Sequence, residues 1–224
     1  MKLLAIDTAT EYCSVALYLD GAISDRAAHE PRAHADNVLP FVSELLAEAG
    51  LALQQLDGIS FGRGPGGFTG LRVAASVTQG LAFGADLPVA GISDLAALAY
   101  GAFDRHGWRD VAAALDARMG EIYYGLYRVS GNGIEVIQDD ALAPPDQVTW
   151  PVGEWRAAGP GWPAHRDALP AAVREAVGET DDAPPQARAI AVLGATELSA
   201  GRGVAPELAI PVYLRDRVAE KRVP

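Results

Sequence analysis

Two stretches decide the fold of this chain: AIDTATEYCSVALY at Ala5–Tyr18 and ALDARMGEIYYGLY at Ala114–Tyr127. Each begins with an alanine, an aliphatic residue and an aspartate, continues through a loop, and ends in a segment that finishes Leu-Tyr. The string Gly-Pro-Gly follows each stretch, at residues 64–66 and 159–161, with unequal separations. Short strand–turn–strand units also resemble each other by chance, but the first match needs no gap. We therefore predict a duplicated fold in which two similar lobes face each other, each with an aspartate turn at the cleft.

Strands alternate with helices around the first stretch. Apolar segments at 3–7, at 13–19 and on to Arg26 predict a three-stranded meander, with a hairpin turn at Asp20-Gly21. Proline is tolerated only in the first turn of a helix, so Pro40 places the start of the next helix near Asp36 or Asn37. The further segments predict helices at 35–49, 69–83 and 94–100 and strands at 58–61 and 89–92. This alternation predicts an α/β fold with parallel neighbouring strands, divided into lobes at 1–105 and 106–224.

The composition is that of an acidic globular protein. The 224 residues carry a formal net charge of −11, and 50% of them are hydrophobic. This acidity excludes a chain that binds nucleic acid by itself, because phosphate binding needs concentrated Lys and Arg. Cys13 is the single cysteine, so no intrachain disulfide or thiolate metal cluster is expected. Asp7 interrupts the apolar stretch of a signal peptide, and no apolar run reaches the roughly 18 residues of a membrane helix. We expect a cytoplasmic protein without a membrane partner.

Four segments resemble one known family. They are AIDT at Ala5–Thr8, GPGGFTGLR at Gly64–Arg72, DARMGEIY at Asp116–Tyr123 and YLR at Tyr213–Arg215. Together they are similar to the bacterial TsaB (YeaZ) family, and the glycine-rich string is the most specific. The resemblance implies an actin-like ATPase (ribonuclease H-like) fold in two lobes. It also implies a non-catalytic subunit of the machinery that installs threonylcarbamoyladenosine in tRNA, with a TsaD-like catalytic partner and a TsaE-like ATPase as a further member.

The turn after Asp7 and the glycine-rich string are the candidate phosphate-binding positions. In an actin-like ATPase a glycine lets the backbone approach a phosphate, but Ala9 stands at that position here. The glycine-rich string would hold an anion at the start of the helix that it enters. The alternatives, which we favour, are an aspartate that caps a turn and a tight strand-to-helix connection. We treat four residues as degenerate phosphate-loop positions, with nucleotide contact only in the complex with a partner: Asp7, Gly64, Gly66 and Gly67.

We expect no catalytic residue and no metal. The resemblance implies that catalytic relatives bind a metal through His-x-x-x-His, at a place where this chain has Asp94 and Leu98. Leucine cannot ligate a metal, and the four histidines lack metal spacing. Cys13 is interpreted as a small core residue, and there is no Gly-x-Ser-x-Gly elbow. The chain alone is therefore not expected to bind a cofactor tightly.

The two helices predicted at 35–49 and 69–83 are the candidate interface. A stripe of larger residues, which includes Val73 and Val77, accounts for packing on the chain's own sheet. A ridge of small residues, spaced four apart from Gly70 to Ala82, lets another helix approach closely, either in this chain or in a partner. The resemblance favours a partner, because in the family these helices contact TsaD as a bundle. The expected interface residues are Leu39, Leu46, Gly70, Leu71, Ala74, Thr78 and Ala82.

These observations predict a scaffold or activator subunit that docks on a TsaD-like catalytic subunit. Alone it is expected to form a homodimer, and it meets tRNA only through the complex. The alternatives are an ATP-dependent enzyme or peptidase-like metallohydrolase of actin-like fold that uses the interlobe cleft, and a plain homodimeric interaction protein. The basic tail is expected to be a solvated end, with partner or tRNA contact as the alternative for Arg215 and Arg217.

Overall fold

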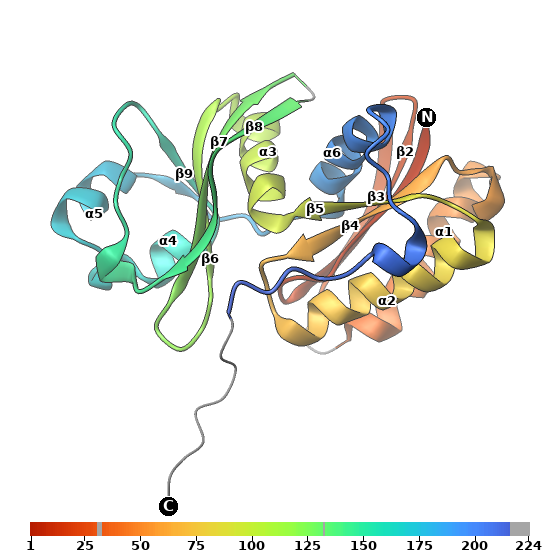
Figure 1. Cartoon of the computed structure of the whole chain (residues 1–224), viewed down its shortest axis with the longest axis horizontal. Helices are drawn as coiled ribbons and strands as arrows, with labels where there is room; N and C mark the ends of the chain where they lie inside the picture. Colours follow the sequence, from red (N-terminus) through yellow and green to blue (C-terminus); the bar gives the residue numbers. More distant parts are fainter. Residues whose placement is uncertain (31–32, 132, 216–224) are drawn as a thin grey trace, which may run out of the picture.

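The first half of the chain forms the first of two five-stranded sheets. The computed structural model describes residues 1–30, 33–131 and 133–215. The strands of this sheet lie in the order β3-β2-β1-β4-β5 (Figure 1). β1 pairs antiparallel with β2 and parallel with β4, as the predicted meander and α/β alternation require. The bounds are β1 Lys2–Asp7, β2 Tyr12–Leu19, β3 Ala22–His29, β4 Gly58–Gly64 and β5 Val89–Ser93.

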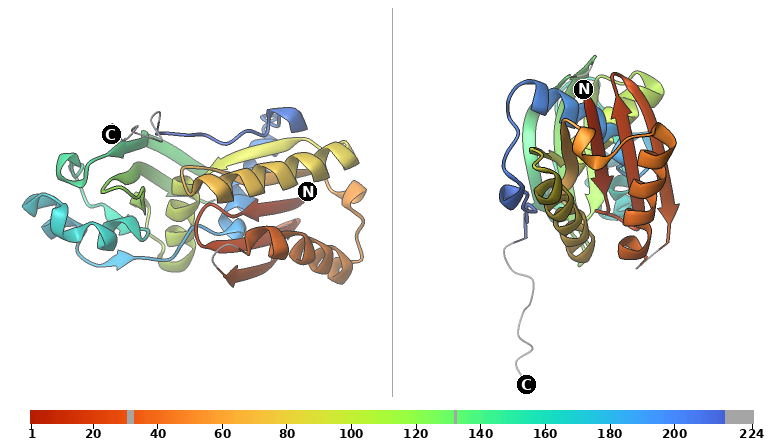
Figure 2. Two further views of the ribbon diagram at one scale, coloured as in Figure 1. Left: turned by 90° about the horizontal axis from the view of Figure 1, so that it is seen from below. Right: turned by 90° about the vertical axis from the view of Figure 1, so that its right-hand side faces the viewer.

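Helices cover both faces of this sheet. α1 (His34–Ala49) and α2 (Phe68–Ala85) lie side by side on one face, as Figure 2 shows from below, and α6 (Ala187–Ser199) lies on the other. Because both faces are covered, β1 is a continuous apolar run rather than an alternating one. Leu4 and Ile6 belong to the core under α1 and α2, whereas Leu3 and Ala5 belong to the core beside α6.

The second sheet repeats the plan of the first. Its order is β10-β9-β6-β7-β8, so a three-stranded meander again lies beside two parallel strands. The strands are β6 Asp110–Asp116, β7 Ile122–Ser130, β8 Gly133–Ala143, β9 Arg156–Ala158 and β10 Thr180–Asp181. One face is covered by α3 (Asp94–His106) and the other by α4 (Gly161–Ala164) and α5 (Ala171–Val177). The predicted duplication is confirmed, since the two Gly-Pro-Gly strings follow β4 and β9.

Two helices pack on the sheet of the other lobe, across the predicted division at residue 105. That division separates the strands of the two sheets, but α3 packs on the second sheet and α6 packs on the first. The Ser14 hydroxyl accepts a hydrogen bond from the Ala187 N–H at 2.9 Å, and the Ser60 hydroxyl donates to the Ile190 carbonyl at 3.2 Å. α3 and α6 contact each other between the sheets, so one core joins the lobes in a five-layer α/β/α/β/α arrangement.

Several element boundaries differ from those predicted, and two of them have a clear physical cause. α1 begins at His34 rather than after Asp36 or Asn37, and Pro40 lies in its second turn. Pro40 is exposed on the outer side of the helix, where water can bond the carbonyl that loses its donor. α3 runs on to His106, because Ser93 caps its start and Gly107, with φ of 72°, ends it. Short 3₁₀ turns lie at Leu53–Gln55, Pro145–Gln147, Arg166–Ala168 and Pro206–Leu208. Over the described ranges, every helix is too short or too polar to cross a bilayer.

Candidate functional site

Asp7 closes β1 and is buried at the junction of the lobes. Its Oδ1 accepts a hydrogen bond from the Ala9 N–H at 2.8 Å, and the next side chain, Thr8, donates to the Gly70 carbonyl at 2.7 Å. The buried Asp94 at the start of α3 lies nearby, since a Cβ atom on Gly62 would lie 3.0 Å from Asp7 Oδ1 and 2.5 Å from Asp94 Oδ1. Burial raises the pKa of Asp7 to about 6 and that of Asp94 well above its usual range. Asp7 is therefore held inside the protein rather than presented to a ligand.

The glycine-rich turn uses its backbone donors within the chain. The Gly64 N–H bonds Asp94 Oδ2 at 2.6 Å, and the Gly67 N–H bonds the Ala9 carbonyl at 2.7 Å. Gly64 also needs its φ of +113°, which other residues rarely adopt. A Cβ atom on Gly70 would lie 1.8 Å from the Thr8 carbonyl oxygen, so α2 rests directly on the loop after Asp7. Of the four predicted phosphate-loop positions, Gly66 and Gly67 line the interlobe cleft, whereas Asp7 and Gly64 are buried beneath it.

The cleft is a cavity of about 770 Å³. The first lobe contributes the loop 9–12 and the start of α2, and the second lobe contributes Asp116, Arg118 and Tyr123. Asp116 closes β6 as Asp7 closes β1, and its Oδ1 accepts a hydrogen bond from the Arg118 N–H at 2.8 Å. The structure therefore brings the two aspartate turns to the interlobe boundary, but only Asp116 lines the cleft.

Two partners of Asp116 were not foreseen from the sequence. His165 Nε2 lies 3.0 Å from Asp116 Oδ1, and the Arg118 guanidinium lies 3.1 Å from Oδ2. Arg118 also pairs with Glu11 of the first lobe at 3.2 Å. The sequence carries one signal for the histidine: it follows the second Gly-Pro-Gly string, which lies against β6. This His–Asp–Arg cluster gives the cleft mixed charge rather than the cluster of cations that a phosphate group requires.

The strap at 209–215 crosses from the first lobe to the second. The Val212 N–H bonds the Arg63 carbonyl at 2.7 Å, and the Arg72 Nε donates to the Tyr213 hydroxyl at 3.1 Å. Arg215 then reaches the second lobe, where it pairs with Glu121 at 2.6 Å and donates to the carbonyls of Ala117 and Arg118. Arg215 is therefore an internal tie rather than a solvated end. The remaining basic residues of the tail lie outside the described residues: Arg217, Lys221 and Arg222.

The small-residue ridge of α2 faces inward. Gly70, Leu71, Ala74, Thr78 and Ala82 are buried against the first sheet and the strap side of the lobe, so they cannot contact a partner in this conformation. The assignment of these five residues to a partner interface stays a prediction, and it would require α2 to move away from the sheet. Small side chains at this spacing let α2 lie close to β4 and to the loop after Asp7, so the ridge packs on the sheet rather than on another helix of this chain.

The outer side of the helix pair carries the exposed apolar residues. Leu39 is 48% exposed, Phe68 45% and Phe83 80%. Leu46, Val73 and Val77 are half-buried along the same two helices. We call Leu39, Leu46, Val73, Val77 and Phe83 the helix-pair face. Two of the predicted interface residues, Leu39 and Leu46, belong to it. Of the larger stripe assigned to internal packing, Val42 and Leu45 are buried as expected, whereas Val73 and Val77 are only partly covered.

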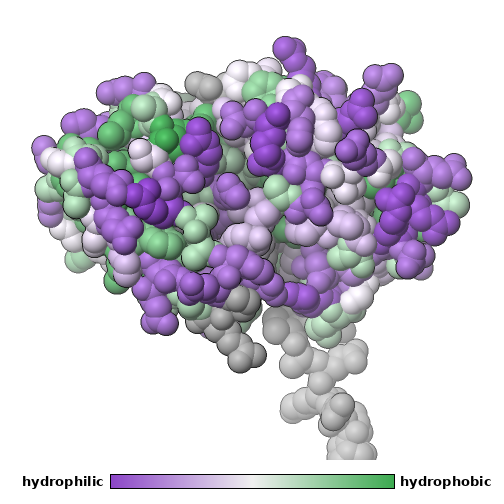
Figure 3. Space-filling view, turned by 180° about the vertical axis from the view of Figure 1, so that it is seen from behind, coloured by the Kyte–Doolittle hydropathy of each residue, from purple (hydrophilic) through white to green (hydrophobic). Residues whose placement is uncertain are grey.

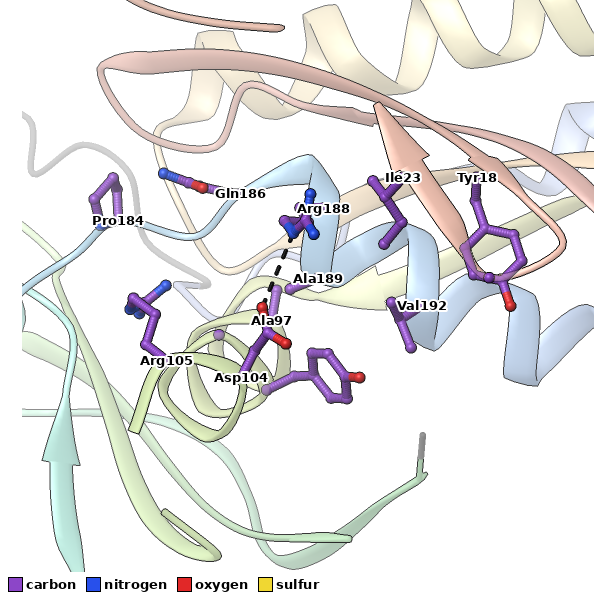
Figure 4. Close-up of a pocket in the computed structure, with 13 residues that line it drawn as sticks. Tyr18, Ile23, Ala97, Asp104, Arg105, Pro184, Gln186, Arg188, Ala189 and Val192 are labelled. Atoms are coloured by element: carbon purple, nitrogen blue, oxygen red, sulfur yellow. Dashed lines mark ion pairs between the residues drawn. The ribbon is translucent and has the colours of Figure 1, made fainter. Parts of the chain in front are cut away.

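A second cavity of about 210 Å³ lies on the rear, where α3 and α6 meet β2 and β3. Hydrophilic residues dominate that side along the junction of the lobes (Figure 3). Arg188 reaches toward Asp104 at 3.9 Å (Figure 4) and pairs with Asp25 at 3.2 Å. Arg105 lines the cavity and pairs with Asp181 at 2.7 Å. Because these charges are satisfied within the chain, the cavity is part of the lobe junction rather than a ligand site.

The predicted absence of metal chemistry can be compared with the residues present. Asp94 and Leu98 are buried at the start of α3, and the described residues contain no group of three or more His, Cys, Asp or Glu arranged to hold a metal. Cys13 is buried in the first sheet, where burial raises the pKa of its thiol to about 12. A buried thiol that stays protonated fits the small core residue expected at this position.

Known proteins resemble this chain over its whole length. A family model described as "TsaD: tRNA N6-adenosine threonylcarbamoyltransferase" matches residues 23–223. The tRNA threonylcarbamoyladenosine biosynthesis protein TsaB of Escherichia coli is 40% identical over 100% of this chain and 99% of its own. The TsaB of Haemophilus influenzae is 38% identical over 100% of this chain and 98% of its own. The solved structure of YeaZ from Pseudomonas aeruginosa is 42% identical, covers 95% of this chain and 99% of its own, and superposes with a TM-score of 0.87. With this identity over both full lengths, the chain belongs to the TsaB (YeaZ) family.

Proposed function

We propose that this chain is a non-catalytic scaffold or activator subunit in the formation of threonylcarbamoyladenosine in tRNA. Family membership supports the pathway, because the relatives named above are biosynthesis proteins for this nucleoside. The match to a TsaD family model, together with the role of the relatives in the same pathway, supports a TsaD-like subunit as the partner. The alternative, an enzyme that uses the interlobe cleft, is not favoured by these relatives.

The residues at and beneath the cleft support a non-catalytic role. Asp7 is buried beside Asp94 and accepts a hydrogen bond from the Ala9 N–H, and the Gly64 and Gly67 N–H groups donate to acceptors inside the chain. A phosphate would need those donors free, because anion binding at a turn relies on several N–H groups that point at one place. The tight binding of a nucleotide is therefore assigned to the complex with the partner, not to this chain alone.

The single observation that carries the docking proposal is the exposure of the helix-pair face. Phe83 is 80% exposed in the last turn of α2, and Leu39 is 48% exposed on α1. Apolar side chains gathered on two adjacent helices mark an interaction surface when they lie beside one another. We propose that the TsaD-like subunit covers this face. When the chain is alone, a second copy covers it and forms the homodimer.

A charge placed on this face tests the proposal. Val77→Arg and Phe83→Arg should each weaken co-purification with the TsaD-like subunit of the same organism at least tenfold, because the complex would bury an unpaired guanidinium. Val152→Arg is the matched control, since Val152 is fully exposed on the second lobe. Light scattering of the chain alone should show the same two variants shifting a dimer to a monomer. Unchanged complex formation by both variants would move the interface elsewhere.

Arginine on the small-residue ridge is not a valid version of this test. Ala74 and Thr78 are fully buried, so Ala74→Arg or Thr78→Arg would unfold α2 and abolish binding because the fold itself is lost.

The TsaE-like ATPase and tRNA are proposed to join only the assembled complex. Titration of the chain alone with labelled ATP, then of the complex, separates these roles: binding by the chain alone would favour the enzyme.

A further inference from the structure

Two buried carboxyl groups face each other where β1, β4 and α3 meet. Asp7 is 1% exposed and Asp94 is fully buried. A Cβ atom on Gly62 of β4 would lie 2.5 Å from Asp94 Oδ1 and 3.0 Å from Asp7 Oδ1. Gly62 therefore makes the space that both carboxyl groups occupy, and any larger residue there would push them apart.

One fully buried oxygen of the pair accepts no hydrogen bond from the described residues. Asp7 Oδ1 accepts from the Ala9 N–H at 2.8 Å, and Asp94 Oδ2 accepts from the Gly64 N–H at 2.6 Å. Asp94 Oδ1 is buried and has no donor in the part of the chain that the structure describes. An ionised carboxylate oxygen in this position would forfeit its hydration without replacement, which costs several kcal/mol. A proton on that oxygen removes the deficit, because it turns the oxygen into a donor toward Asp7.

The neighbouring charged groups do not compensate for the hydrogen bond that Asp94 Oδ1 lacks. From β8, Asp140 adds a negative charge that acts on Asp94, and from β2 the Cys13 thiol is neutral and donates to the His34 carbonyl. Asp140 is itself bonded to the Ser93 and Tyr127 hydroxyls, and Arg63 is the cation that acts on it. Neither Asp7 nor Asp94 forms an ion pair within 4.0 Å among the described residues. Two ionised carboxylates would thus repel each other with no cation between them.

We propose that Asp7 and Asp94 form a proton-binding site in which Asp94 stays protonated at neutral pH and donates its proton to ionised Asp7. The bonded carboxyl pair connects the turn after β1, the glycine-rich turn after β4 and the first residue of α3, which packs on the opposite sheet. It also fixes Asp7 inside the protein, away from the cleft. This inference does not depend on the proposed function, because its readouts are protonation and stability.

The pH dependence has a defined sign. Burial raises the pKa of both groups above the value of about 4 that an aspartate has in an unfolded chain. Folding therefore takes up protons above about pH 4, and stability that is present at low pH is lost as the pH rises through the folded-state pKa values. For each proton that the folded state holds and the unfolded state releases, the equilibrium constant of unfolding rises about tenfold for every unit by which the pH rises. Asp7 contributes to this loss of stability up to about pH 6, whereas Asp94 still contributes to it at higher pH.

Asp94→Asn is the central experiment. An amide is nearly isosteric with the acid and can donate to Asp7 at any pH, so the variant should fold and lose one proton-linked step. Chemical denaturation from about pH 5 to about pH 8 should show the ratio of the unfolding constants, wild type over variant, rising about tenfold per pH unit until Asp94 titrates. Asp86→Asn is the matched control, because Asp86 is exposed and outside the pair. Its ratio to wild type should stay constant over the same range.

A spectroscopic readout tests the proton directly. The carbonyl stretch of a protonated carboxylic acid in the full chain at pH 7 should be present in wild type and in Asp86→Asn, and absent in Asp94→Asn. If Asp94→Asn does not fold, Asp7→Asn serves as the second variant, and its ratio of unfolding constants should also rise with pH. Absence of the acid band in wild type at pH 7 would overturn the proposal. So would stoichiometric binding of Mg²⁺ or Mn²⁺ that Asp94→Asn abolishes, because a cation would then replace the proton.

Discussion

In the first lobe Asp7 ends β1 and accepts a hydrogen bond from the N–H two residues later; in the second lobe Asp116 ends β6 and does the same, also at 2.8 Å. In both lobes a Gly-Pro-Gly string then closes against the strand or loop that carries the aspartate. The surroundings differ: Asp7 is buried against a second carboxyl, whereas Asp116 lines the cleft with an imidazole and a guanidinium. The duplicated feature is thus the backbone turn, and the chemistry of each aspartate is set by what the rest of its lobe packs against it.

The largest expected loss of stability comes from a substitution that would force α2 away from the turn after Asp7. Gly70→Ala should destabilise the chain by about 3 kcal/mol or more, or prevent folding, because its Cβ would lie 1.8 Å from the Thr8 carbonyl oxygen. Gly80→Ala on the same helix faces open space and should raise stability by roughly 0.5–1 kcal/mol. Denaturant unfolding of the two variants measures the difference.

Gly161→Ala extends this test to the other lobe. Its Cβ would lie 2.6 Å from the Leu115 backbone nitrogen, so it should also be strongly destabilising. If Gly161→Ala were neutral while Gly70→Ala was not, the second turn would be only a loose copy of the first.

The partner of Asp116 provides the next test. Asp116→Ala removes the acceptor of the Arg118 N–H and of the His165 ring, and should cost about 1–2 kcal/mol, since the carboxylate is partly exposed and water replaces some of its bonds. A double-mutant cycle with His165→Ala isolates the pair. A coupling energy near zero would show that the imidazole only lies near Asp116 and does not position it.

A smaller loss of stability is expected when Arg215, which joins the strap to the second lobe, is removed. Arg215→Ala should lower stability by about 1 kcal/mol and speed hydrogen exchange in the turn at 117–121, because Arg215 bonds the carbonyls of Ala117 and Arg118. That turn holds two consecutive non-glycine residues at positive φ, Arg118 at 61° and Met119 at 56°. Arg202→Ala, which breaks the exposed pair with Glu197 inside one lobe, should leave this exchange unchanged.

The smallest effect belongs to the surface pair at the mouth of the cleft. Glu11→Gln should change stability by no more than about 0.5 kcal/mol, because Glu11 and Arg118 are both exposed and salt screens their attraction. Thermal unfolding should show this small difference at low salt and an even smaller one at high salt. A salt-dependent loss larger than that of Arg215→Ala would make this pair, not the strap, the main link between the lobes.

The strands and the duplication could be predicted from the sequence because they rest on local patterns. The gapless match of Ala5–Tyr18 with Ala114–Tyr127 corresponds to β1–β2 and β6–β7 in the structure. The direction of the α2 ridge could not be predicted, because Gly70 and Ala74 suit a sheet, a neighbouring helix or a partner equally well. The exchange of α3 and α6 between the lobes and the pairing of Asp7 with Asp94 depend on long-range packing, which no local spacing records. The rule applied to Pro40 failed because an exposed proline can be solvated in the second turn.

The placement of α6 on the first sheet has a consequence for how the protein is made. Leu3 and Ala5 of β1 are covered on one side only when α6 arrives, and α6 ends at Ser199. During synthesis the first five strands leave the ribosome long before their final covering helix. A lobe cut at residue 105 would likewise expose an apolar sheet face. The first lobe therefore cannot complete its core before residues 187–199 have been translated, so the two lobes do not fold one after the other as separate units.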